Sequence, residues 1–177
     1  MRVRPLGPDD APAMLELRVR NREHFLTGEP VREQAFFTLE RQRATLAAAE
    51  AERRIGTRVL LGVFDDDTLA GYVALSQISR GAFQNAFLGY AIDGERTGRG
   101  LATAAVAAAL EHAWELDLHR VQANVAPDNV ASHRVLEKNG FRYEGLALRY
   151  LLIGGRWTDH AMYAITVEER PGADPPA

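Results

Sequence analysis

The chain has 177 residues, of which 46% are hydrophobic and 25% are charged, and its formal net charge is −3. This profile is typical of a globular protein that buries a core of its own. The small negative charge argues against general nucleic-acid binding, although it leaves a local basic patch open. Because the chain has no cysteine, it can form no disulfide, no thiolate zinc site and no cysteine nucleophile.

The same sequence contains no sign of a membrane or export segment. No apolar run approaches the ~20 residues that a membrane-spanning helix needs. The beginning of the chain, MRVRPLGPDD, lacks the apolar core of a signal peptide. We therefore expect a cytoplasmic protein with no membrane partner, no direct nucleic-acid partner and no metal.

The first third of the chain predicts a short strand followed by two helical regions. Asp9 or Asp10 can cap a helix that carries the apolar residues Met14 and Leu17. Residues 32–54 are rich in helix formers and charges, which is typical of a helix with a solvated face. The aromatic side chains that we expect in the core are those of Phe36, Phe37 and Phe87.

Three short apolar runs follow, over residues 58–64, 69–78 and 85–92. Residues 65–68, with the sequence DDDT, separate the first two runs, and residues 79–84, SRGAFQ, separate the next two. Both separators have turn chemistry. The spacing therefore fits three antiparallel strands.

The second half predicts alternating helices and strands and then a hairpin. The predicted elements are a helix over residues 100–115, a strand over residues 119–125, a capped helix that ends near Gly140, and a hairpin over residues 148–167. This order predicts an α+β fold with a mixed, mostly antiparallel central sheet flanked by helices. We expect residues 1–170 to form one domain, and the proline-rich residues 171–177 to be a disordered tail.

A glycine turn, T-G-R-G-L-A-T at residues 97–103, leads into the helix over residues 100–115. Glycines and a helix N-terminus together suit a phosphate. A Walker loop is excluded, because the Gly-Lys-Ser/Thr ending is absent. The dinucleotide fingerprint fits poorly, because Thr103 occupies the place of its third glycine and residues 118–124 offer no acid for the ribose. Two interpretations remain. The turn either binds the pyrophosphate of coenzyme A or is a tight turn that binds no ligand and needs its glycines for geometry alone.

The turn and its neighbours resemble the GNAT superfamily of N-acetyltransferases. The family motif is Gln/Arg-x-x-Gly-x-Gly/Ala, which the chain matches at Gly100 and Ala102. Thr97 stands where the family has Gln or Arg, and Arg96 can compensate. The preceding LGYAI resembles the splayed strand that pairs with the pantetheine arm. The resemblance implies that acetyl-CoA is bound by Tyr90, Ala91, Ile92, Thr97, Gly98, Arg99, Gly100, Leu101, Ala102, Thr103 and Asn129.

A second match, APDNVASHRVLEKNGFRYEG, looks like the family's Asn-x-x-Ser…Gly-Phe segment. It implies that Asn129 and Ser132 face the pantetheine and the sulfur. On local sequence alone, Asn129 could equally be a helix cap and Ser132 a first-turn residue. Four stretches also resemble the Rim-type ribosomal-protein-alanine N-acetyltransferases: RNREHFLTGEPVRE, SRGAFQNAFLGYAI, HRVQANVAPDN and YLLIGGRWTDHAMYAIT. This likeness runs from about residue 2 to residue 166.

The chemistry that the resemblance implies is acetyl transfer from acetyl-CoA to a primary amine. Without cysteine, no cysteine-bound acetyl intermediate can form, so direct transfer in a ternary complex is the simpler route. Some relatives use a glutamate and a tyrosine, but Asn124 and Leu136 stand at those positions here. The expected catalytic residues are therefore Ser132, Asn129 and Glu29.

Two further readings concern the candidate bases. Glu29 could instead be a solvated loop acid. Asp159 and His160 could supply a base or form a structural pair that fixes the hairpin. A free α-amine, with a pKa near 7.7–8.0, is partly unprotonated at neutral pH, so a weak base acting through water would be enough.

The sequence does not identify which amine accepts the acetyl group. The leading hypothesis is the N-terminal α-amine of a protein, and the alternative is a small amine such as an amino acid or an antibiotic. A hypothesis of another class is a non-catalytic domain that senses acetyl-CoA; retention of HFLTGEPVR favours an enzyme. The chain is expected to be a monomer or a homodimer.

Overall fold

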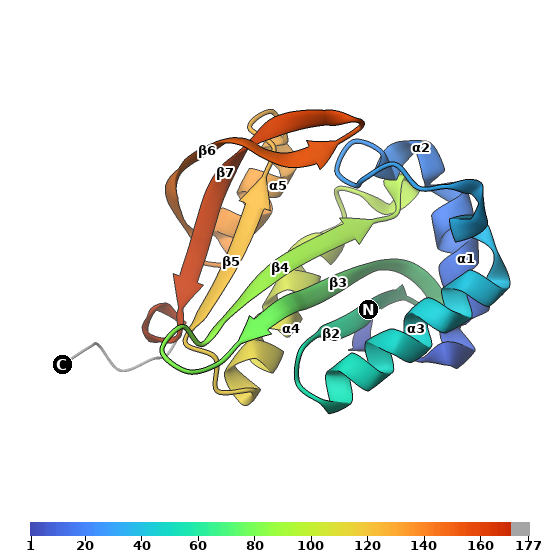
Figure 1. Cartoon of the computed structure of the whole chain (residues 1–177), viewed down its shortest axis with the longest axis horizontal. Helices are drawn as coiled ribbons and strands as arrows, with labels where there is room; N and C mark the ends of the chain where they lie inside the picture. Colours follow the sequence, from blue (N-terminus) through green and yellow to red (C-terminus); the bar gives the residue numbers. More distant parts are fainter. Residues whose placement is uncertain (171–177) are drawn as a thin grey trace.

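In the part of the chain that the structure describes, seven strands form one mixed sheet in the order β1-β2-β3-β4-β5-β7-β6 (Figure 1). The computed structural model describes residues 1–170. Only β4 and β5 run parallel, and the other neighbouring strands are antiparallel. The strands are β1 (Arg2–Pro5), β2 (Val59–Asp65), β3 (Thr68–Ser79), β4 (Asn85–Ile92), β5 (Arg120–Val125), β6 (Arg142–Ile153) and β7 (Arg156–Thr166). The predicted fold class, α+β with a mostly antiparallel sheet flanked by helices, is confirmed.

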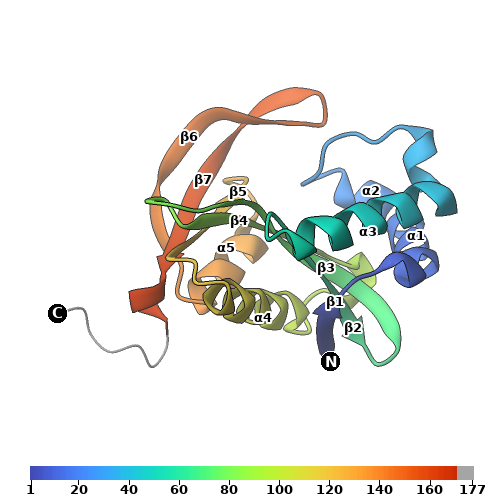
Figure 2. The same ribbon diagram turned by 60° about the horizontal axis from the view of Figure 1, so that its bottom comes forward.

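Helices cover the two faces of this sheet unequally (Figure 2). One apolar cluster packs α4 and α5 against one face, and a second packs α1 and α3 against β2 and β3 on the other. Every residue of β2 is buried, because helices cover both of its faces. The helices are α1 (Ala11–Arg20), α2 (Arg22–Phe25), α3 (Leu39–Arg54), α4 (Leu101–Glu115) and α5 (Val130–Lys138), with short 3₁₀ turns η1 (Pro8–Asp10), η2 (Gln34–Phe37), η3 (Gly94–Arg96) and η4 (Val167–Glu169).

Most of the predicted elements agree with the structure, but two expectations were wrong. Strand β6 begins at Arg142, well before the predicted start at residue 148. The side chains of Phe36, Phe37 and Phe87 are only partly buried, so their assignment to the core was wrong. Phe36 and Phe37 instead lie beneath the guanidinium groups of arginines on α1 and α2. The expected tail, residues 171–177, lies outside the described residues.

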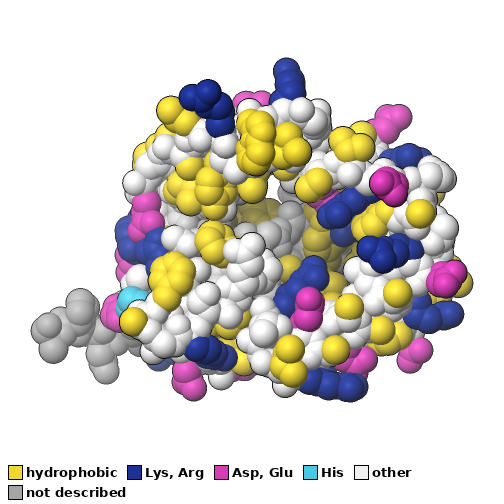
Figure 3. Space-filling view, in the orientation of Figure 1, with side chains coloured by type: hydrophobic (Ala, Val, Ile, Leu, Met, Phe, Trp, Pro, Cys, Tyr) yellow, Lys and Arg dark blue, Asp and Glu magenta, His cyan; other side chains and the backbone are white. Residues whose placement is uncertain are grey.

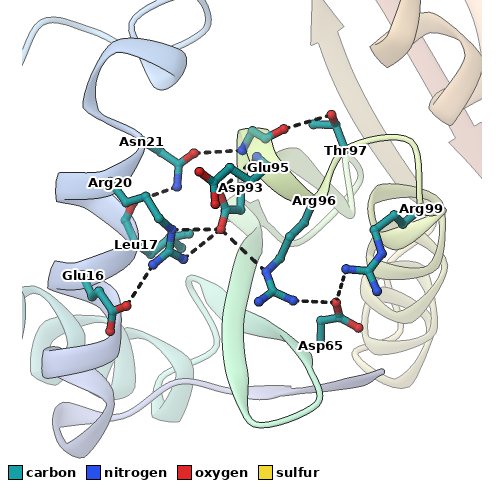
Figure 4. Close-up of polar contacts among 11 residues, drawn as sticks. Glu16, Leu17, Arg20, Asn21, Asp65, Asp93, Glu95, Arg96, Thr97 and Arg99 are labelled. Carbon is teal, nitrogen blue, oxygen red and sulfur yellow. Dashed lines mark hydrogen bonds and ion pairs between the residues drawn. The ribbon is translucent and has the colours of Figure 1, made fainter.

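A buried carboxylate fastens the end of β4 to the N-terminal helices (Figure 4). Asp93 is 1% exposed, and its Oδ2 accepts hydrogen bonds from Nε and Nη2 of Arg20 at 3.0 and 2.8 Å. The next residue is held as well, because the backbone N–H of Gly94 donates to Asn21 Oδ1 at 2.8 Å. Helix α1 therefore fixes the point where the chain leaves β4 and enters the glycine turn.

A second carboxylate secures the other side of the turn. Asp65, at the end of β2, accepts from Arg96 Nη1 and lies 2.7 Å from Arg99 Nη1. Arg96 precedes the two glycines of the turn and Arg99 lies between them, so Asp65 at the end of β2 and Asp93 just after β4 anchor the same short loop (Figure 4).

Burial acts to raise the pKa of the Asp93 carboxyl, but hydrogen bonds from Arg20 and neighbouring groups outweigh it, so this pKa lies below its ordinary value. A carboxyl whose pKa is depressed in the folded state stabilises the fold above its unfolded pKa, near 3.9, and loses that contribution as the pH falls through the folded pKa. We predict that Asp93→Asn lowers the free energy of unfolding at pH 7 by about 1–3 kcal/mol, because it removes a charge-assisted pair. The deficit should shrink below about pH 4.

The measurement is denaturant unfolding of both proteins at pH 7, 5 and 3.5. Glu16→Gln is the matched control, since Glu16 also pairs with Arg20, at 3.0 Å, but its side chain is 73% exposed. That change should cost no more than about 0.5 kcal/mol. A constant difference between wild type and Asp93→Asn at all three pH values would contradict the role given to the carboxylate.

Candidate active site

Strands β4 and β5 separate halfway along their length. Residues Asn85 to Leu88 pair with Arg120 to Ala123, and there the ladder ends. Strand β4 continues through Gly89 to Ile92, still paired with β3 but no longer with β5. The LGYAI segment is thus splayed, as the family resemblance implied, and its backbone groups on the β5 side are left without a strand partner.

The glycine turn lies beyond the splayed end of β4. Gly98 and Gly100 have φ values of +74° and +80°, which non-glycine residues rarely adopt. No atom lies within 4 Å of where a Cβ would stand at either position, so both glycines face open space. Gly100 is the N-cap of α4, and the free N–H groups of the first turn of this helix follow it.

A cavity of about 430 Å³ is enclosed between the turn, the end of β4 and helix α5. All of the residues expected to bind the coenzyme border it, except Arg99. The side chain of Arg99 turns away to Asp65, which leaves only its backbone for a ligand in the turn (Figure 4). The bordering residues from that expectation are Tyr90, Ala91, Ile92, Thr97, Gly98, Gly100, Leu101, Ala102, Thr103 and Asn129.

Basic side chains gather around this cavity. Arg134 and Lys138 border it from α5, and neither is paired with a carboxylate within residues 1–170. Arg96 borders it too, but its guanidinium is engaged by Asp65 and lies 3.8 Å from Asp93. Arg96 thus holds the turn in place, whereas the helix cations are available for an anion. A positive rim beside a glycine turn suits phosphate groups.

Ser132 and Asn129 meet at the N-terminus of α5. Asn129 caps the helix, because its Oδ1 accepts a hydrogen bond from the Ser132 N–H at 3.0 Å. The cap alternative is therefore realised for Asn129, which also borders the cavity. Ser132 has a further partner that sequence reasoning missed: its Oγ lies 2.6 Å from the hydroxyl of Tyr90. Only the backbone of Tyr90 was expected to act, and a contact over this sequence distance leaves no local signal.

A second cavity, of about 590 Å³, lies on the same face of the sheet as α1 and α3. It occupies the part of that face that these helices leave uncovered, which we call the open face. Figure 3 shows this face hollowed between the β6–β7 hairpin and the loop after α2, with apolar side chains along the hairpin side. The two cavities share a set of bordering residues, which we call the junction: Thr27, Gly28, Glu29, Tyr90, Asn129 and Ser132. A ligand in one cavity can therefore meet a ligand in the other beside Ser132.

Glu29 lies at the junction and forms an ion pair with Arg18. It is therefore not the solvated loop acid that the sequence left as an alternative. Both of its carboxylate oxygens lie 2.7 Å from Arg18 Nη1, and Oε1 also accepts from the Tyr72 hydroxyl. Burial raises the pKa of Tyr72. Burial also acts to lower the pKa of Arg18, but Tyr72 and Glu29 outweigh this effect, so the pKa of Arg18 lies above its ordinary value. These contacts hold the Glu29 carboxylate in one position at the border of both cavities.

The other residues considered from the sequence lie outside the junction. Asn124 borders the second cavity, where its Nδ2 donates to the Tyr150 hydroxyl at 3.2 Å. Asp159 and His160 do not pair with each other. Asp159 accepts from the Arg149 N–H at 2.7 Å and so fixes the hairpin, whereas His160 is buried and borders the second cavity. Leu136, where some relatives have a tyrosine acid, is fully buried.

The described residues, 1–170, contain no group of three or more acidic, histidine or cysteine side chains that could hold a metal ion. In the same part of the chain, no helix is both long and apolar enough to cross a membrane.

Comparison with known proteins agrees with this geometry. Residues 1–142 match the acetyltransferase (GNAT) domain family. The chain is 41% identical over 166 residues to the probable N-acetyltransferase YjcK of Bacillus subtilis, with 92% of each chain covered. It is 32% identical over 170 residues to the [ribosomal protein uS5]-alanine N-acetyltransferase of Escherichia coli, with 94% of this chain and 88% of the relative covered.

A solved structure extends the likeness to three dimensions. Mycobacterium smegmatis RimJ in complex with CoA-disulfide superposes with a TM-score of 0.91 at 34% identity, over 97% of this chain and 84% of that one. The chain therefore belongs to the GNAT acetyltransferase family and is a Rim-type N-acetyltransferase that takes its acetyl group from acetyl-CoA.

Proposed function

We propose that the protein acetylates the N-terminal α-amine of a protein, by direct transfer from acetyl-CoA in a ternary complex. The observation that carries this proposal is the junction, where two cavities meet beside Ser132. The coenzyme would lie in the cavity of the glycine turn and the acceptor in the cavity of the open face. The name of the Escherichia coli relative, a [ribosomal protein uS5]-alanine N-acetyltransferase, supports a ribosomal protein as the acceptor.

The shape of the acceptor side supports a chain end. The second cavity is hollowed into an open face, and both the hairpin and the loop after α2 border it. A protein N-terminus can enter such a hollow while the rest of its chain stays outside. Apolar side chains along the hairpin offer a surface on which residues beyond the first can rest.

The proposed reaction joins the amine nitrogen to the acetyl carbonyl carbon and breaks the bond from that carbon to sulfur. The amine enters neutral, which an α-amine can do near neutral pH because its pKa is close to 7.7–8.0. A carboxylate oxygen of Glu29 accepts a hydrogen bond from the neutral amine and so orients it at the junction, and the proton that the nitrogen loses passes to water. Ser132 gives a hydrogen bond to the departing thiolate, and Asn129 keeps Ser132 in place by capping its helix.

The test of the acceptor is a peptide that begins with alanine and contains one lysine. We expect one acetyl group on the α-amine, located by fragmentation mass spectrometry, and release of coenzyme A at an equal rate. The same peptide with a blocked N-terminus should give no product. Acetylation of the lysine with an untouched N-terminus would refute the α-amine proposal, and a product from free amino acids or amines alone would favour a small-molecule acceptor.

The test of the coenzyme turn is Gly100→Val. The side chain would enter the open space of the first cavity and strain a backbone that has φ +80°. We predict that it weakens acetyl-CoA binding at least about tenfold, measured by calorimetry, and removes most of the rise in Tm that acetyl-CoA gives.

Gly81→Val is the matched control for this substitution. Gly81 has a similar φ of +70° and open space around its missing Cβ, but it borders neither cavity. It should cost comparable stability and leave the Kd of acetyl-CoA unchanged. Equal Kd values for wild type and Gly100→Val would place the coenzyme elsewhere.

The test of Ser132 is its replacement by alanine. Because the hydroxyl is proposed to act only on the developing thiolate, Ser132→Ala should lower kcat and kcat/KM together, by about 10²-fold, the low end for general-acid help. The KM for acetyl-CoA and the Tm should change little, since the Asn129 cap uses the backbone N–H. A mutant with the wild-type kcat would reduce Ser132 to a first-turn helix residue.

A further inference from the structure

We propose that Tyr90 is a positioning residue whose hydroxyl directs the hydrogen of Ser132 toward the sulfur of the coenzyme. The inference deepens the proposed function and rests on it. Tyr90 reaches from the splayed part of β4 to the first turn of α5, where its hydroxyl lies 2.6 Å from Ser132 Oγ. Both residues belong to the junction.

The first step concerns which hydroxyl donates. Two hydroxyl groups at 2.6 Å share one hydrogen, so one of them must be the donor. If Ser132 donated to Tyr90, its single hydrogen would be occupied and none would remain for a leaving thiolate. If Tyr90 donates to Ser132, the hydrogen of Ser132 is free to point elsewhere.

The surroundings of Tyr90 favour the second arrangement. The phenol is largely enclosed, and burial raises its pKa, so it keeps its hydrogen at neutral pH. Among residues 1–170, the acceptors near this hydroxyl are both on Ser132: Oγ at 2.6 Å and the backbone oxygen at 3.4 Å. A buried donor hydrogen needs an acceptor, and the shorter contact is the better one.

The consequence falls on Ser132. A hydroxyl that accepts one hydrogen bond becomes a somewhat stronger donor in the next, because hydrogen bonds in a chain polarise one another. Its one hydrogen is then free to point into the junction, where the proposed reaction breaks the carbon–sulfur bond. The electron pair of that bond goes to sulfur, and Ser132 stabilises it by a hydrogen bond. Tyr90 itself loses no proton.

The experiment is a double-mutant cycle with Tyr90→Phe and Ser132→Ala. Tyr90→Phe keeps the ring and removes one hydrogen bond, so we expect kcat to fall about 3- to 10-fold with the KM for acetyl-CoA unchanged. Because Tyr90 acts through Ser132, the double mutant should have the kcat of Ser132→Ala alone. Independent, multiplied losses in the double mutant would overturn the proposal.

Tyr163→Phe is the matched control. Tyr163 is a buried tyrosine whose hydroxyl also contacts α5, through His133 Nδ1 at 2.9 Å, but neither Tyr163 nor His133 borders either of the two cavities. It should leave kcat unchanged, whereas an equal loss of kcat in Tyr163→Phe would show that any tyrosine anchoring α5 has this effect and would overturn the proposal.

A second measurement tests the role of Tyr90 independently of the acceptor's identity. Slow hydrolysis of bound acetyl-CoA expels the same thiolate and needs no amine. If the peptide is not acetylated, the proposed acceptor fails, and the hydrolysis rate still tests Tyr90: a 3- to 10-fold loss in Tyr90→Phe supports its role. Wild-type rates of both hydrolysis and transfer in Tyr90→Phe would overturn that role whatever the acceptor is.

Discussion

The separation of β4 from β5 is the constraint on which the rest of the site depends. The two strands share only the ladder from Asn85 to Leu88, and beyond it each is held by a different partner. Strand β5 stays paired with β7 as far as Val125, while the end of β4 is tied to α1 through Asp93. The space between them contains the junction. Neither cavity would reach the other if the parallel ladder continued.

Buried charges give the N-terminal helices a role in this geometry. Arg20 binds the acid that ends β4, and Arg18, on the same helix, binds Glu29 at the junction. Such enclosed pairs are costly to break, because removal of one partner leaves an uncompensated charge. Helix α1 therefore positions both the start of the glycine turn and the loop after α2 that borders the two cavities, although no residue of α1 itself borders either cavity.

The sequence predicted the parts of this arrangement whose signals are local. Apolar alternation and turn residues located the strands, and the glycine turn could be assigned because Gly98 and Gly100 require unusual backbone angles. The contact between Tyr90 and Ser132 could not be predicted, since it joins residues far apart in the chain. Charge pairing was equally invisible, because no local pattern predicts that the side chain of Arg99 pairs with Asp65.

The hairpin illustrates a different limit. Two register shifts break its ladder, and between Ala147 and Leu151 the backbone of Arg149 has φ +50°. Nothing in a run of leucines predicts such a bulge. The shift matters because it decides which side chains of β6 turn toward the open face, and the bond from Arg149 to Asp159 stabilises it.

The two cavities are built from segments with largely separate sequences, which bears on how an enzyme of this kind can diversify. The glycine turn and the helix that it begins border the first cavity, whereas the hairpin and the strand before α5 border the second. In the proposed arrangement, substitutions or insertions in the hairpin therefore alter the acceptor site and leave the coenzyme site unchanged. Related enzymes can in this way keep the same thioester chemistry while their acceptor substrates change.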